Sequence, residues 1–341
     1  MTTLSASTAD FSVASHAAMP SRSKNLDGMR GLAILGVIWL HAAATLPEGA
    51  GMFAVPFFVI VAMVMTARSV VRHPEQSTAA YVGKRIARLY PAFLFWCLVY
   101  EAIRQAKALQ TGGIGSIRID MRGFVGGTYE HLWFVPFLLL ATMIIVPLVK
   151  LTSRSVPAQR TVAVMVIVAA IILSILPVPP QIQMLEGPWK CIRASYWALP
   201  AMLTGIAIAM LGMNRRAELR VPPALGYAGI VLLVASTAVQ WHATDPWLPA
   251  ATLGGLGALW IAMSGIASPL LPRMAWLGAM SLGIYLSHVV FLRVLVIVCE
   301  KKQIGAGAAV DVIGFVLALI GAIAVTWTLS RSRWTRWTVG A

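Results

Sequence analysis

Apolar runs of about 20 residues recur along nearly the whole chain and are separated by short polar connections. An α-helix of that length spans the hydrocarbon core of a bilayer. The pattern therefore predicts an all-α, polytopic transmembrane helical bundle of about ten spans. The third span, Leu89–Ala106, is the least regular, because charged residues crowd its C-terminal end. An interfacial helix is the alternative for that end. The predicted spans are Gly31–Leu46, Met52–Val70, Leu89–Ala106, His131–Leu151, Thr161–Val178, Tyr196–Met213, Pro223–Trp241, Trp247–Ala267, Trp276–Cys299 and Ala309–Ser330.

Composition agrees with a membrane protein of one domain. The chain is 59% hydrophobic and 11% charged, whereas soluble domains carry about 25% charged residues. We expect a disordered tail over 1–22, a transmembrane domain over 23–336 and a short tail over 337–341. The three cysteines show neither metal-ligand spacing nor a disulfide framework, and no metal motif is present.

The net charge of +15 is distributed by topology rather than as a nucleic-acid surface. With the N-terminus inside, the cytoplasmic connections and tails hold 18 of the 27 basic residues but four of the 12 acidic ones. Positively charged connections stay in the cytoplasm. The chain is therefore expected to have both termini in the cytoplasm and no nucleic-acid partner.

Arg30 and His41 lie at the two ends of one apolar stretch. Eleven residues are about three helical turns, so both side chains lie on nearly the same face, roughly 16 Å apart. His41 would then lie deep in the membrane, where an ionisable group is a candidate functional residue. We interpret it as a general base or transient acyl acceptor, with a hydrogen bond to a neighbouring helix as the alternative. Asp27 either caps the first helix or orients Arg30.

A second basic group precedes the third span. Lys84, Arg85 and Arg88 are spaced three and four apart, so they share a face if this segment is helical. Each alone would serve as an interfacial anchor, but arginine forks also bind phosphate oxygens in bidentate fashion. With Arg30 they suit a long ligand whose phosphates stay at the surface while its reactive end reaches inward. Acyl-coenzyme A has that shape.

Polar side chains also form a stripe on the ninth span. Tyr285 and His288 follow Ser281 by four and seven residues on an otherwise apolar helix. Such stripes either join helices or contact substrate. His131 and Trp133 open the fourth span, where an aromatic belt would also explain the tryptophan.

The chain resembles the integral-membrane acyltransferase-3 family. The resemblance rests on four motifs in the family's order, which cover the chain from about Asn25 to His288. They are Leu26-Asp27-Gly28-Met29-Arg30-Gly31 followed by His41, Arg85 with Arg88-Leu89-Tyr90-Pro91, His131-Leu132-Trp133-Phe134, and Gly278 with Ser281, Tyr285, Leu286 and His288.

The resemblance implies a bacterial inner-membrane enzyme that transfers an acyl group, usually acetyl, from acyl-CoA as co-substrate to a sugar hydroxyl. Acceptors are exported or surface polysaccharides or their lipid-linked precursors, and polysaccharide assembly machinery is a further expected partner. No cofactor is expected to be bound permanently. By this resemblance His41 is catalytic with Arg30, and Arg30, Lys84, Arg85 and Arg88 face the CoA. The remaining motif residues line the pore or the acceptor side: Ser281, Tyr285, His288, His131, Trp133 and Asp27.

One departure and two rival interpretations accompany this resemblance. The polysaccharide-modifying branch often has a glutamate shortly after the tryptophan of the fourth span, where this chain has Val135, Pro136 and Phe137. We therefore expect the single-domain form. A glycan or lipid transporter would also need about ten spans and buried polar groups, but not a phosphate-binding cluster aligned with one histidine. An inactive acyltransferase-like assembly protein is the other alternative.

Overall fold

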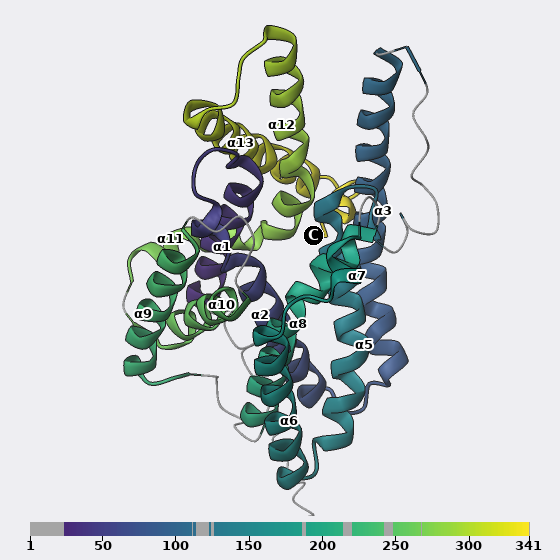
Figure 1. Ribbon diagram of the computed structural model, residues 1–341. Helices are drawn as coiled ribbons and strands as arrows, with labels where there is room; N and C mark the ends of the chain where they lie inside the picture. The colour runs from purple at the N-terminus through teal and green to yellow at the C-terminus, as the bar shows by residue number, and fades with distance from the viewer. Residues whose placement is uncertain are drawn as a thin grey trace, which may run out of the picture.

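The computed structural model describes residues 24–110, 112–113, 123, 126–185, 189–213, 220–241, 248–266 and 268–340. The tail expected over 1–22 lies outside these ranges. Regular structure in the described residues is helical throughout (Figure 1). The long helices are α1 (Lys24–Ala42), α2 (Ala54–Arg72), α3 (Thr78–Gln110), α5 (Phe134–Thr152), α6 (Val156–Ile175), α8 (Lys190–Gly212), α9 (Pro223–Gln240), α10 (Leu248–Met263), α11 (Leu270–Ala279), α12 (Ser281–Lys302) and α13 (Ala308–Arg331). The short ones are η1 (Glu48–Gly51), η2 (Glu130–Trp133), α7 (Pro180–Gln183) and η4 (Arg336–Val339).

Several of these helices are long and apolar enough to cross a bilayer. Within the described residues, eight segments of at least 18 residues have the hydropathy of a membrane span. Helix α10 has only 16 residues, and α1 carries charged residues in its first half, so neither belongs to the eight. The expected number of about ten spans is therefore not confirmed, whereas the all-helical, multi-pass architecture is.

Two predicted spans have different boundaries in the structure. Helix α3 is 33 residues long, so the basic segment around Arg85 and the predicted third span form one continuous helix through Pro91. The predicted span Trp276–Cys299 instead comprises parts of two helices, because the backbone leaves helical geometry at Met280, with φ −93° and ψ 2°. The break makes Ser281 the first residue of α12.

Helix α1 lies at the centre of the contacts between the helices. It packs against α2, α10, α11, α12 and α13. Helix α2 contacts α5, α8 and α10 in turn. Figure 1 shows α9, α10 and α11 grouped on one side of the molecule, while α3 and α12 extend beyond the other helices at the top of the view. There, Lys107 of α3 and Glu300 of α12 form an ion pair at 2.8 Å.

Glycines allow α1 to approach α11 closely. A Cβ atom added at Gly278 of α11 would lie 1.7 Å from the carbonyl oxygen of Asp27, and one added at Gly28 would lie 1.9 Å from the carbonyl oxygen of Leu271. Both distances are far inside van der Waals contact, so a larger residue at either position must separate the helices. This contact sets the position of the first turns of α1.

A carboxylate fixes the chain immediately after α1. Oδ2 of Asp311 accepts hydrogen bonds from the backbone N–H and hydroxyl of Thr45, both at 2.7 Å, and from the N–H of Leu46 at 2.9 Å. Asp311 belongs to the first turn of α13 and is buried. Because three donors satisfy this buried charge, the segment after His41 is held against α13.

Gly278→Ala tests the close packing of α1 on α11. We expect a loss of about 1–3 kcal/mol in the free energy of unfolding, as for other overpacked sites, visible as a lower thermal midpoint in detergent. Gly83→Ala on α3 is the control, because nothing lies within 4 Å of the added Cβ and alanine favours a helix. A Gly278→Ala protein as stable as the Gly83→Ala protein would contradict the packing argument.

Candidate functional site

A cavity of 1230 Å³ opens between α1, α2, α3, α12 and the segment after α13. We call it the basic cavity. Sites for drug-sized ligands have volumes of about 300–1,000 Å³, so this cavity accommodates a larger molecule. Its lining extends along α2 from Phe58 to Arg72, about 21 Å at 1.5 Å per residue.

Seven basic side chains and one acidic side chain, Asp27, line the basic cavity among the described residues. Low-dielectric walls lined by one sign of charge concentrate ligands of the opposite sign. The ligand that this cavity fits best is therefore a polyanion. The basic residues are Lys24, Arg30, Arg68, Arg72, Arg85, Arg88 and Arg220.

Arg30 is held by two neighbours. Its Nη1 donates to Oδ1 of Asp27 at 3.2 Å, and its Nη2 donates to Oγ of Ser281 at 3.0 Å. Asp27 lies within the first turn of α1, so of the two roles predicted for it the structure supports orienting Arg30. The guanidinium thus links α1 to the first residue of α12, and its direction is fixed before any ligand binds.

The arginines of α3 lie at a different wall. Arg85 and Arg88 both line the basic cavity, whereas Lys84 is exposed and does not. Nη2 of Arg88 donates to the carbonyl oxygen of Gly340 at 3.4 Å. The indole N–H of Trp96 donates to the carbonyl oxygen of Thr338 at 2.8 Å. The residues expected to form a short tail are therefore packed against α3 and complete the cavity wall.

The inner end of the basic cavity is closed by apolar and aromatic residues. Ile34, Phe58, Phe134 and Tyr285 lie there, and we call them the inner wall. The rings of Phe134 and Tyr285 are 5.5 Å apart. The hydroxyl of Tyr285 donates a hydrogen bond to the carbonyl oxygen of His131, which fixes the ring in this position.

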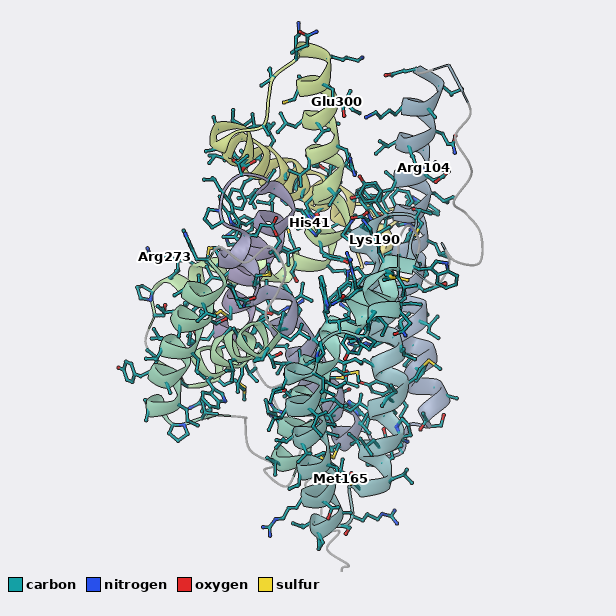
Figure 2. The ribbon with its side chains drawn as sticks, viewed as in Figure 1. His41, Arg104, Met165, Lys190, Arg273 and Glu300 are labelled. Atoms are coloured by element: carbon teal, nitrogen blue, oxygen red, sulfur yellow. The ribbon has the colours of Figure 1, made fainter. Side chains whose placement is uncertain are left out.

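Three histidines from distant parts of the sequence lie beyond the inner wall. The ring centroids of His41 and His288 are 5.2 Å apart, those of His131 and His288 5.3 Å, and those of His41 and His131 5.9 Å. We call this group the histidine cluster. His131 and His288 are buried, while His41 is exposed and lies near the centre of the molecule in Figure 2. The described residues provide no group of three His, Cys, Asp or Glu side chains arranged to hold a metal ion.

The structure thus brings most of the predicted residues together, but in two compartments. Arg30, Arg85 and Ser281 line the basic cavity, whereas His41 does not. Tyr285 belongs to both, because it lines the cavity and its ring centroid is 6.2 Å from that of His288. Tyr285 is thus a point at which the basic cavity and the histidine cluster meet.

Trp133 lies outside both compartments. Its ring packs edge-on against those of Phe134 and Phe137 at the start of α5. It does not line the basic cavity. In the structure its contacts support the inner wall through Phe134 rather than reach a ligand.

Other residues of the site were not predicted from the sequence. Lys24, Arg68, Arg72 and Arg220 line the basic cavity. These residues lie at the ends of apolar stretches, where basic residues commonly serve as interfacial anchors. The sequence does not distinguish the two roles, because the position of each residue relative to the cavity depends on how the helices pack. Tyr100 was also missed; its ring lies 4.9 Å from that of His131.

Comparisons with known proteins support one assignment. Residues 23–331 match the family model described as the acyltransferase domain of acyltransferase family 3. Comparison with curated proteins finds no match, and neither does comparison with solved structures. The matched segment covers most of the chain and includes the histidine cluster and the lining of the basic cavity except Val339 and Gly340.

Cysteine labelling tests the two-compartment arrangement. In a background with Cys97, Cys191 and Cys299 replaced by alanine, we expect Arg72→Cys to react with a membrane-impermeant maleimide added at the basic mouth. His41→Cys should react only when the reagent is added at the other side, because the cavity mouth and His41 lie toward opposite ends of α1. Reaction of both cysteines from the same side would contradict the separation.

Proposed function

The chain belongs to acyltransferase family 3, and we propose that it moves an acyl group, most simply acetyl, from acyl-CoA to a sugar hydroxyl. The acceptor is an exported or surface polysaccharide or its lipid-linked precursor. In this proposal the protein lies in the bacterial inner membrane with both termini and the basic cavity facing the cytoplasm.

The basic cavity is the observation that carries the proposal. Coenzyme A has three phosphoryl groups with roughly four negative charges, and seven basic side chains line the cavity. Arginine forks bind phosphate oxygens in bidentate fashion. Arg85 and Arg88 of α3 and Arg68 and Arg72 of α2 supply such forks from two walls. A glycan transporter has no need of this charge.

The depth of the cavity suits the shape of the donor. A pantetheine arm is about as long as four or five extended peptide residues, roughly 15 Å. With the phosphates near the mouth, the arm extends along α2 past Met65 toward Phe58, and the thioester arrives at the inner wall. Arg30 lies one helical turn before Ile34 on α1, so its charge is close to the thioester end.

His41 supplies the chemistry in one of two ways. As general base it takes the proton from the sugar hydroxyl while the oxygen attacks the thioester carbonyl; the C–S bond breaks, and the thiolate takes that proton back from the imidazolium. As acyl carrier it attacks the carbonyl itself, and the C–S bond breaks to release CoA as the thiolate. The sugar oxygen then attacks the acyl-imidazolium, the acyl–nitrogen bond breaks, and the hydroxyl proton goes to the thiolate. Both routes need a neutral His41 nitrogen beside the thioester, and hence a displaced Tyr285.

The exposure of His41 supports approach of the acceptor from the other side of the membrane. The residue is exposed in the described structure although it does not line the basic cavity. A polymer too large to enter the cavity can then present a hydroxyl to His41 while the donor remains on the cytoplasmic side. The sugar is thus modified without the acyl-CoA leaving the cytoplasm.

His41→Ala should lower the acyl-transfer rate about 10²–10⁴-fold, because general-base or nucleophilic assistance is lost. Transfer of label from radioactive acetyl-CoA by purified protein with a membrane glycan extract measures this. His73→Ala, an exposed histidine just after α2, is the matched control and should keep full activity. Equal activity of the two variants would exclude His41 as catalytic; transport of glycan without acyl transfer by the unaltered protein would favour the transporter.

Arg85→Gln should weaken acetyl-CoA binding about tenfold or more, since a charge-assisted bond to phosphate is lost. A thermal-shift or calorimetric titration measures the affinity. Arg154→Gln is the control, because Arg154 is exposed after α5 and does not line the basic cavity. Identical affinities in the two variants would contradict binding of the donor in this cavity.

A further inference from the structure

We propose that His288 is a positioning residue that accepts a hydrogen bond at Nε2 from a ring N–H of His41. This bond would fix which nitrogen of His41 remains free to act on the substrate. The inference rests on the proposed function only in giving His41 the catalytic role; the bond itself is a statement about the protein alone.

The tautomer of His288 is set by the backbone of its own helix. Its Nδ1 lies 2.7 Å from the carbonyl oxygen of Tyr285 and 3.2 Å from that of Ile284. Carbonyl oxygens only accept, so Nδ1 must carry the hydrogen. In the neutral ring Nε2 then has no hydrogen and presents a lone pair. His288 can therefore act only as an acceptor toward the histidine cluster.

That acceptor has no partner in the described structure. Nε2 of His288 is buried without a hydrogen bond, and the side chain is 0% exposed. An unpaired polar atom in a protein interior is unfavourable and normally signals a missing partner. The rings of His41 and His131 lie nearest, with centroids 5.2 Å and 5.3 Å from that of His288. We assign the donor to His41, because His41 is exposed and its ring can turn, whereas His131 is buried. The imidazole of His41 contributes an N–H in either neutral tautomer.

The spacing of the two rings matches a hydrogen bond between them. A ring nitrogen lies about 1.15 Å from the centroid of an imidazole, so a linear N–H···N bond of about 2.9 Å places two centroids roughly 5.2 Å apart. The centroids of His41 and His288 are 5.2 Å apart. The proposed bond requires the exposed His41 ring to turn about its own side-chain bonds until one ring N–H points at Nε2 of His288.

The bond would serve either chemical route. His41 presents one nitrogen with a lone pair to the thioester or hydroxyl, while its other nitrogen keeps its hydrogen and donates to His288. When His41 becomes positively charged, by taking a proton or an acyl group, its N–H becomes a stronger donor. His288 therefore stabilises the charged intermediate as well as orienting the ring, and no proton passes to it.

The position of His288 also depends on the inner wall. Tyr285 accepts from His288 through its carbonyl, and its own hydroxyl donates to the carbonyl of His131. The same residue therefore closes the basic cavity and orients the acceptor of the histidine cluster. Movement of the Tyr285 ring to admit the thioester leaves this carbonyl, and with it the tautomer of His288, in place.

Two amide substitutions separate the positioning role from a structural one. In His288→Gln the amide oxygen replaces Nε2 as acceptor; in His288→Asn the amide group replaces Nδ1 and keeps the bond to the Tyr285 carbonyl but not the acceptor. We expect kcat to fall about 10–100-fold in His288→Asn and less than about fivefold in His288→Gln.

The KM for acetyl-CoA should stay unchanged in both variants, because His288 does not line the basic cavity. A merely structural His288 would reverse the order, with His288→Asn the more active, and that result would overturn the proposal.

A spectroscopic measurement tests the bond without activity and without substituting His288. In protein with ¹⁵N-labelled histidine, His288 should show a protonated Nδ1 and a hydrogen-bonded, unprotonated Nε2. His41→Ala should shift the Nε2 resonance toward that of a free lone pair, whereas the control His73→Ala should leave it unchanged. An Nε2 resonance insensitive to His41→Ala overturns the proposal. If the shift occurs but the protein transfers no acyl group, the bond stands and the proposed function fails.

Discussion

The contact between α1 and α11 is the constraint on which the rest of the site depends. Only hydrogen atoms at Gly28 and Gly278 let the two backbones approach so closely. That approach places the first turns of α1 beside the start of α12, where Arg30 reaches Ser281 at 3.0 Å. The side chain of Arg30 is only partly buried, because it faces the basic cavity. Its charge is stabilised by the carboxylate of Asp27, by the hydroxyl of Ser281 and by the opening of the cavity.

A single helix therefore organises both compartments. Arg30 and His41 occupy nearly the same face of α1, about three turns apart. The inner wall crosses between them at the level of Ile34 and Tyr285. At its far end the helix is held by Asp311, which fixes the segment that follows His41. The relative positions of the cationic group and the imidazole are thus determined by the length of one rigid element.

The sequence allowed the helical class and most apolar segments to be predicted, and it gave the pairing of Arg30 with Asp27 as one of two alternatives, because these depend on local periodicity and spacing. Ser281, Tyr285 and His288 were also correctly predicted to share one helix. The break at Met280 and the fold-back of residues around Thr338 onto α3 could not be predicted, because both depend on contacts between distant segments. For the same reason the sequence suggested one continuous path from Arg30 to His41, whereas in the structure Arg30 lines the basic cavity and His41 does not.

The inner wall bears on how much of the proposed acyl donor would be lost to hydrolysis. A thioester beside an accessible imidazole is open to attack by any small nucleophile, and water is always the most abundant. In the proposed function, a donor resting in the basic cavity is kept apart from His41 as long as the hydroxyl of Tyr285 stays bonded to the carbonyl oxygen of His131. The inner wall would then limit hydrolysis of the thioester, and each movement of Tyr285 away from His131 would expose one acyl group to reaction.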